Sequence, residues 1–196
     1  MTFWNNLYSE ETIPTIHSPL SISKKHILLT GDPGIGKSTI VKKVISKLSC
    51  PKSGVYAEED LLNGERVGFF VCTLDGRKAY LAHQNMQSEF RVGPYGVNVK
   101  AINSLVIPAI VPTDAFVIII DEIGLMQCCA PDFLPAVTQA LDSEKSIFGT
   151  ISLQNTEPLM EIKNREDVQI IEVTSENRNF LAEIILEHLS KQTSHM

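Results

Sequence analysis

Several features that mark special classes of protein are missing from this sequence. No stretch approaches the roughly 18 consecutive apolar residues of a transmembrane helix, and the longest apolar run, residues 115–120, has the length of a β-strand. Lys and Arg never occur in runs longer than a pair, and the net charge is −6. The N-terminal residues contain neither the basic nor the apolar stretch of a secretory signal. We therefore expect no membrane anchorage and no generic surface for nucleic acids.

Cysteine is scarce and is not arranged for metal binding. Of the four cysteines, Cys50 and Cys72 stand alone, while Cys128 and Cys129 are adjacent. There is neither a C-x-x-C pair nor a Cys/His zinc spacing. Such cysteines are typical of reduced thiols, and they predict a cytoplasmic protein.

The composition indicates one folded domain with a short extension before it. The chain has 196 residues, of which 43% are hydrophobic and 20% are charged, so it has enough apolar side chains for a core. Residues 1–24 are polar and lack periodicity, and they predict an N-terminal extension that is disordered or strapped onto the surface. Within it, Trp4 and Tyr8 stack on a base, anchor the extension to the surface, or are unstructured. Residues 25–196 form the predicted domain.

Strand-like and helix-like segments alternate along this domain. Short apolar runs ended by turn residues predict strands at 26–30, 54–57, 67–74, 78–82, 115–120, 146–153 and 168–173. Apolar residues at helical spacing predict helices at 38–49, 132–141 and 156–163, and a last helix that opens at Ser175. The alternation predicts an α/β fold, a mostly parallel sheet with helices on both faces. The Asn63-Gly64 turn and the strands around it predict a hairpin-rich insertion.

A phosphate-binding loop is the clearest motif in the sequence. Residues 31–38, Gly-Asp-Pro-Gly-Ile-Gly-Lys-Ser, match G-x-x-x-x-G-K-[ST] at every fixed position, between a predicted strand and a predicted helix. Glycines let the backbone curl so that its N–H groups point at phosphate oxygens, and the following helix adds the positive end of its dipole. The predicted nucleotide-binding residues are Gly31, Asp32, Pro33, Gly34, Ile35, Gly36, Lys37, Ser38 and Thr39.

Two residues of this loop have predicted chemical roles. We expect the Lys37 ammonium to reach the β- and γ-phosphates and to neutralise charge that develops during a reaction. We expect the Ser38 hydroxyl to bind Mg²⁺, the cofactor that the motif predicts. The predicted ligand is a nucleoside triphosphate. The glycines do not fit the G-x-G-x-x-G spacing of the dinucleotide-binding fold.

A pair of acids completes the predicted site. Asp121 and Glu122 follow the apolar run at 115–120, at the carboxyl end of a predicted central strand. Ligands bind at this edge in open α/β sheets. Because side chains alternate along a strand, we expect the two acids to have different tasks. Asp121 fits a Mg²⁺ ligand beside Ser38, directly or through a water. Glu122 fits the catalytic group that polarises the attacking water, with Lys37 as the other catalytic residue.

Several further segments resemble a known family. Besides the phosphate loop, the resemblance rests on GVYAEE at 54–59, RVGF at 66–69, RVGPY at 91–95, DEIG at 121–124, GTI at 149–151 and ENRN at 176–179. These segments are similar to those of the small nucleoside-triphosphatases first described from thermophiles, whose vertebrate member is called cancer-related nucleoside-triphosphatase. The resemblance implies a RecA-like P-loop NTPase fold. It also implies slow hydrolysis of ATP, GTP and other nucleoside triphosphates to the diphosphate and phosphate.

The chain departs from that family at a few charged positions. Where the family usually continues DEIG with Lys-Met-Glu, this chain has Leu125, Met126 and Gln127. Leu61 stands where the family usually has an arginine. The changes leave the predicted magnesium and water-activating residues intact. Any role of those charges in the rate or in base recognition is therefore not carried over to this chain.

The positive charges available to a transition state are few. The chain has five arginines, and Arg91 and Arg178 lie in the family-like segments. Each is either a catalytic cation, acting in its own chain or in a neighbour, or part of a surface ion pair. Thr150 either hydrogen-bonds the γ-phosphate or only favours its strand.

Two other functions stay open beside hydrolysis. The first is a kinase that transfers the γ-phosphate to a small acceptor, and the second is a nucleotide-dependent switch that signals to a partner. A kinase usually needs an arginine-rich lid that excludes water, and residues 54–97 offer room for a pocket but few arginines. The sequence identifies neither a base preference nor a protein partner.

Overall fold

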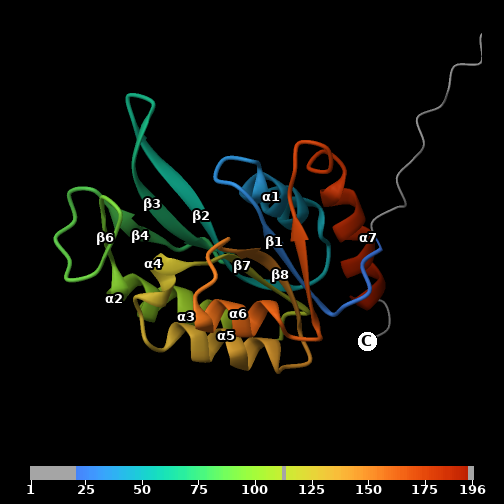
Figure 1. Cartoon of the computed structure of the whole chain (residues 1–196). Coiled ribbons are helices and arrows are strands. Elements are labelled where there is room, and N and C mark those ends of the chain that lie inside the picture. The colour runs from blue at the N-terminus through green and yellow to red at the C-terminus, as the bar shows by residue number, and fades with distance from the viewer. Residues whose placement is uncertain (1–20, 112–113, 194–196) are drawn as a thin grey trace, which may run out of the picture.

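A nine-stranded sheet forms the centre of the molecule (Figure 1). The computed structural model describes residues 21–111 and 114–193. The strands are β1 (His26–Thr30), β2 (Lys52–Leu62), β3 (Glu65–Thr73), β4 (Lys78–His83), β5 (Arg91–Val92), β6 (Tyr95–Val97), β7 (Val117–Ile123), β8 (Ser146–Ile151) and β9 (Val168–Glu172). Across the sheet they lie in the order β5-β6-β4-β3-β2-β7-β8-β1-β9.

The two halves of the sheet differ in strand direction. β2, β7, β8, β1 and β9 are parallel, whereas β3, β4, β6 and β5 continue the sheet beyond β2 as antiparallel strands. The sheet is therefore mixed rather than mostly parallel. The predicted hairpin-rich insertion is part of this same sheet, because β2 pairs with β7 at its start and with β3 along its length. The predicted turn between β2 and β3 is confirmed, with φ of 54° at Asn63 and 83° at Gly64.

Helices cover both faces of the sheet, as predicted (Figure 1). They are α1 (Lys37–Lys47), α2 (Val99–Ala101), the π-helical segment η1 (Ile102–Val106), α3 (Ile107–Ile110), α4 (Leu125–Cys128), α5 (Phe133–Leu141), α6 (Glu157–Lys163) and α7 (Leu181–Thr193). α1 and α7 pack over Ile119 and Phe148, and η1, α3, α5 and α6 pack over Ile118 and Ile147 on the other face. Alternate residues of the central strands thus enter two separate cores. Within the described ranges, no helix is long and apolar enough to cross a membrane.

The helices at residues 99–110 have no counterpart in the sequence prediction. Ile102, Val106 and Ile110 are buried at intervals of four residues, which is a helical spacing. The helix is divided, however, into α2, the π-helical η1 and α3. Pro108 lies in α3 and has no N–H group to donate to a carbonyl of the turn before it. A helix interrupted in this way gives only a weak periodic signal.

The predicted start of the last helix is wrong. Residues 175–180 form a turn, and α7 begins only at Leu181. The Asn177 side chain accepts a hydrogen bond from the Thr174 amide at 2.9 Å and donates one to the Glu172 carbonyl at 2.8 Å. Such local bonds from an Asn side chain compete with helix formation. The Ser175-Glu176 pair therefore belongs to this turn and is not the first turn of a helix.

The predicted extension lies mostly outside the described residues. Residues 1–20, with Trp4 and Tyr8, are among those that the structure does not describe. Just after them, the Ser23 amide donates to Gln169 Oε1 at 3.1 Å, and Gln169 Nε2 donates to the Ser21 carbonyl at 3.0 Å. Residues 21–23 are therefore held along β9, the strand at one edge of the sheet.

Candidate active site

The loop between β1 and α1 curls through three glycines with positive φ, Gly31, Gly34 and Gly36. Gly31 has a φ of 133°, and a Cβ atom there would lie 2.8 Å from the carbonyl oxygen of Val173. The backbone of the loop therefore touches the segment that follows β9. Gly36, the N-cap residue of α1, has a φ of 115° and supplies no side-chain cap. The first amides of α1 are thus free of a side-chain cap at the end of the helix that attracts anions.

Most of the loop is open to solvent. Asp32, Pro33 and Gly34 are exposed, and Thr39 is exposed in the first turn of α1. Ile35 is partly buried and packs against the core between α1 and the sheet. The loop is therefore anchored at one apolar side chain while its curved backbone stays accessible to a ligand.

The Lys37 side chain folds back over this loop. Its ammonium donates hydrogen bonds to the Gly31 carbonyl at 2.6 Å and to the Asp32 carbonyl at 3.0 Å. The positive charge is thus held above the curl of the backbone, where the motif predicts the β- and γ-phosphates.

The predicted magnesium ligands lie next to each other. Ser38 at the start of α1 donates from Oγ to Asp121 Oδ1 at 3.3 Å, and Thr150 of β8 donates to the same oxygen at 2.7 Å. Asp121 is buried, and its Oδ2 atom has no hydrogen-bond partner within the described structure. Burial raises the pKa of Asp121, while the bonds from Thr150 and Ser38 act in the opposite direction. The three residues join the phosphate loop to the two central strands β7 and β8.

Glu122 lies beside this cluster. Asp121 and Glu122 are both within β7, which begins at Val117 and continues to Ile123, so the predicted strand ends too early. Burial and then the Asp121 charge raise the pKa of Glu122, and the Lys37 charge lowers it. A Cβ atom on Gly124 would lie only 3.1 Å from Glu122 Cδ, so a glycine at this position leaves room for the carboxyl group.

The structure adds neighbours that sequence reasoning did not place at the site. Lys42 of α1 lies one turn after Ser38, and its charge lowers the pKa of Asp121. Side chains four residues apart lie on the same face of a helix, so the spacing between Ser38 and Lys42 is the signal in the sequence that points to Lys42. Burial, followed by the charges of Cys129 and Glu122, raises the pKa of Cys128 to about 11.

The departures from the family pattern lie in two different places. Gln127 is buried, and its Oε1 atom lies 3.4 Å from where a Cβ of Gly124 would be, so it is close to Glu122. Leu61, in contrast, is 56% exposed near the end of the β2–β3 hairpin. Gln127 therefore borders the candidate active site, whereas Leu61 lies on a projecting surface.

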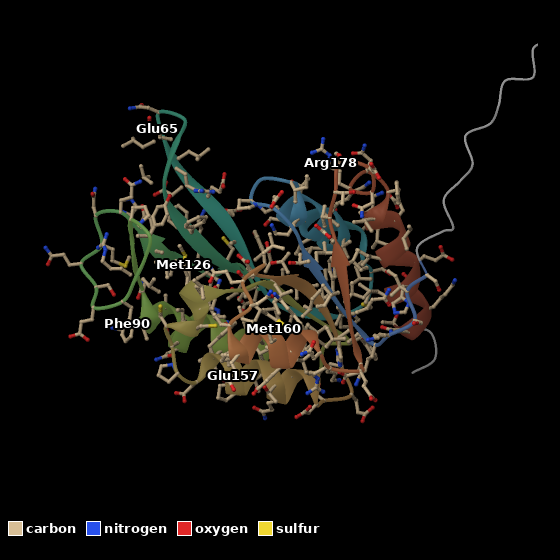
Figure 2. The ribbon with its side chains drawn as sticks, viewed as in Figure 1. Glu65, Phe90, Met126, Glu157, Met160 and Arg178 are labelled. Carbon is tan, nitrogen blue, oxygen red and sulfur yellow. The ribbon has the colours of Figure 1, made fainter. Side chains whose placement is uncertain are left out.

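The structure separates the two arginines that the sequence ranks equally. Arg91 is in β5 at one end of the sheet, where it donates to the Pro94 carbonyl. Arg178 is in the loop that joins β9 to α7, at the opposite end, and its Nη1 atom donates to the Ile35 carbonyl at 3.5 Å. Figure 2 shows Arg178 beyond the carboxyl end of β9, on the same side of the sheet on which the phosphate loop follows β1. Of the two, only Arg178 is brought to the candidate site.

Comparisons with known proteins identify relatives of this chain. The model of the family described as NTPase matches residues 26–186. A nucleoside-triphosphatase THEP1 from Thermotoga sp. (strain RQ2) is 41% identical over 166 residues, which are 83% of this chain and 94% of that protein. The human cancer-related nucleoside-triphosphatase is 37% identical over 175 residues, which are 80% of this chain and 92% of that protein.

Two solved structures have the same fold. The crystal structure of THEP1 from Aquifex aeolicus matches with a TM-score of 0.77 at 35% identity, over 84% of this chain and 98% of that one. The solution structure of a human cancer-related nucleoside triphosphatase matches with a TM-score of 0.73 at 35% identity, over 85% and 98%. The predicted α/β P-loop NTPase fold is confirmed. The chain belongs to the NTPase family, and the relatives named above are nucleoside-triphosphatases.

Proposed function

We propose that the chain hydrolyses nucleoside triphosphates, including ATP and GTP, to the diphosphate and phosphate in the presence of Mg²⁺. The observation that carries this proposal is the cluster of Ser38, Asp121 and Thr150, which joins the phosphate loop to the acid pair of β7. A loop alone would support nucleotide binding. A loop with two acids beside it supports chemistry on the terminal phosphate. The names of the relatives support the same reaction.

The oxygen atoms of this cluster suit Mg²⁺. Asp121 Oδ2 is buried without a partner in the described structure, and the Ser38 hydroxyl lies 3.3 Å from the other oxygen of the same carboxylate. Magnesium prefers such oxygen ligands, and it usually combines one or two protein groups with phosphate oxygens and waters. No group of three or more His, Cys, Asp or Glu side chains within the described residues would hold a metal alone. Ser38 and Asp121 would therefore hold the ion together with the nucleotide, and it would supply charge neutralisation at the β- and γ-phosphates.

Residues of the chain bind the phosphates, neutralise charge and orient the attacking water. The backbone N–H groups of the loop, apart from Pro33, which has none, and those of the first turn of α1 bind the phosphates. Lys37, now bonded to two loop carbonyls, neutralises the charge that develops on the γ-phosphate. Glu122 orients the attacking water and accepts its proton. Thr150 holds Asp121 through a buried hydrogen bond of 2.7 Å and is a positioning residue.

Phosphate release measured with and without acceptors tests this proposal. The purified full chain is incubated with Mg²⁺ and ATP or GTP, and diphosphate and free phosphate are both quantified. Hydrolysis gives equal amounts of the two products without any acceptor, and chelation of Mg²⁺ stops it. Diphosphate without free phosphate, formed only when a small acceptor is added, would show a kinase. Tight binding with no repeated turnover would show a nucleotide-dependent switch, and either result would replace the proposal.

The four cysteines support a proposal about location. Cys50, Cys72, Cys128 and Cys129 are all free thiols. Free thiols persist in reducing compartments, so we propose that the protein works in the cytoplasm.

A further inference from the structure

Two positively charged side chains contact the backbone of the phosphate loop. Lys37 belongs to the loop itself and bonds to the carbonyls of Gly31 and Asp32. Arg178 comes from the β9–α7 loop, and its guanidinium donates to the Ile35 carbonyl. The Arg178 side chain is exposed, so its guanidinium has room to change partner when a ligand arrives.

The other arginines are occupied elsewhere. Arg66 pairs with Glu59 at 2.8 Å, Arg77 with Asp75 at 2.9 Å, and Arg165 with both Asp142 and Asp167 at 2.8 Å. Arg91 bonds to a carbonyl at the far end of the sheet. Arg178 forms no ion pair with any carboxylate in the described part of the chain. It is therefore the arginine whose charge is both unpaired there and in contact with the phosphate loop.

The backbone that carries Arg178 is held firmly against this loop. β9 pairs with β1 in parallel, and the Val173 amide extends the pairing by donating to the Thr30 carbonyl at 2.8 Å. The turn that follows is closed by the Asn177 side chain and by a bond from the Arg178 amide to the Thr174 carbonyl at 3.1 Å. The position of the Arg178 backbone is thus determined by the same strand that supports the phosphate loop.

The partner of the Arg178 guanidinium in this structure is weak compared with a phosphate. A peptide carbonyl is a neutral acceptor, and the N–O distance of 3.5 Å is long. Phosphate oxygens are charged, and arginine binds them through shorter, stronger and often paired hydrogen bonds. A triphosphate in the loop would therefore compete successfully for this side chain.

We infer that Arg178 binds the triphosphate of the nucleotide in its own chain, from the side of the loop opposite Asp121 and Glu122. The strand order β7-β8-β1-β9 places the acids on one side of β1 and Arg178 on the other. Arg178 then adds a second positive charge to that of Lys37 as charge builds on the phosphates during the reaction. This inference rests on the proposed function for the identity of the ligand.

Binding of ADP and of tripolyphosphate tests the contact without any turnover. Calorimetric titration of Arg178→Ala should show both ligands bound about tenfold more weakly than by the wild type, because the lost contact is to phosphate, which both share. Arg178→Lys should retain part of the affinity, since it keeps the charge. Arg178→Gln keeps an N–H donor for the Ile35 carbonyl but no charge, so it should behave like the alanine variant. Arg77→Ala, which removes an arginine paired on the β3–β4 turn, is the matched control and should bind like the wild type.

Several outcomes of this titration would overturn the inference. Unchanged affinity for both ligands would remove Arg178 from the site. Weaker binding of ADP with unchanged binding of tripolyphosphate would assign Arg178 to the base or the sugar. Wild-type affinity in Arg178→Gln would mean that the side chain only positions the loop. All of these readouts stay valid even if the wild type proves not to hydrolyse nucleotides, so the inference and the proposed function fail separately.

A mixing experiment decides whether Arg178 acts in its own chain. Arg178→Ala should lower kcat at least a hundredfold, because arginine contacts of this kind contribute about 10³-fold or more to phosphoryl transfer. Mixing Arg178→Ala with Lys37→Ala supplies intact Arg178 on one chain and an intact phosphate loop on the other. The mixture should stay as inactive as its components. Restored hydrolysis would show that the arginine is donated between chains, and an unchanged kcat in Arg178→Ala alone would refute a role in the reaction.

Discussion

Acid should destabilise this protein through one buried histidine at the start of the strand that leads to the phosphate loop. His26 opens β1 and is 0% exposed. Its Nδ1 atom accepts a hydrogen bond from the Ile147 amide at 3.1 Å, so the ring proton of the neutral form is on Nε2. Nε2 lies 3.6 Å from Asp167 Oδ2. Burial, helped by the charges of Lys25 and Arg165, lowers the pKa of His26 to about 4, although the Asp167 charge acts in the opposite direction.

The size of the effect follows from the difference between the folded and unfolded states. In the unfolded chain the His26 pKa is 6.5, so between the two values the unfolded state binds a proton that the folded state does not. The contribution of His26 to the free energy of unfolding is therefore fully present above its unfolded-state pKa. It is lost as the pH falls toward its folded-state pKa. Lowering the pH from about 7.5 to about 5 should remove about 2 kcal/mol from the free energy of unfolding. The Asp167 pKa is lowered, mainly by its bond to Arg165, so its own contribution is lost only at more acidic pH.

Denaturant unfolding at a series of pH values measures this loss. Helical circular dichroism is the suitable signal, because the one tryptophan, Trp4, lies outside the described domain. His26→Asn is the matched variant, since its side-chain oxygen can still accept the Ile147 amide but does not titrate. It should be less stable than the wild type at neutral pH, yet lose about 2 kcal/mol less between about pH 7.5 and pH 5. Parallel curves for the two proteins would refute the reasoning.

Four further predictions concern the site. Lys37→Ala should weaken ATP binding at least tenfold, a loss of about 1.4 kcal/mol, with little change in melting temperature without ligand; an unchanged dissociation constant would contradict the phosphate-loop assignment. Glu122→Gln should bind nucleotide normally but hydrolyse it about 10²-fold more slowly, whereas Asp121→Asn should raise the Mg²⁺ concentration needed; a wild-type rate in Glu122→Gln would make that residue structural. Thr150→Val should cost about 1–3 kcal/mol of stability, because it removes a buried bond to Asp121, and no loss would show that the bond is dispensable. Wild-type turnover should stay below about 1 per second, and the rate per molecule should not change over a hundredfold dilution; a rate that rises with concentration would point to a cation from a neighbour.

Local patterns predict the central part of the fold well. The strand at His26–Thr30 has the predicted bounds, because a short apolar run ended by glycine is typical of a buried strand before a tight loop. A loop and α1 follow it, and α1 spans Lys37–Lys47 where the sequence predicts 38–49. In these segments the local signal agrees with the distant pairing of β1 with β8 and β9, so the prediction and the structure coincide.

Predictions fail where distant or competing contacts decide the structure. The start of α7 is wrong because one side chain, Asn177, closes a turn with bonds that no periodicity reveals. The strands β3 to β6 join the main sheet because β2 extends past its partner β7, which the sequence of β2 alone does not indicate. Thr150 is the clearest case at the site. From the sequence, Thr150 either favours its strand or hydrogen-bonds a ligand. Only the pairing of β8 with β7 places its hydroxyl against Asp121.

Strand order explains why the candidate site draws on segments that are far apart in the chain. Because β1 lies between β8 and β9, the loop that follows it has a different neighbour on each side. On one side, β8 and β7 bring Thr150 and the acid pair. On the other, the turn after β9 brings Arg178. The separation of acids and arginine by the phosphate loop keeps them from neutralising each other, which the proposed binding of a triphosphate with Mg²⁺ requires.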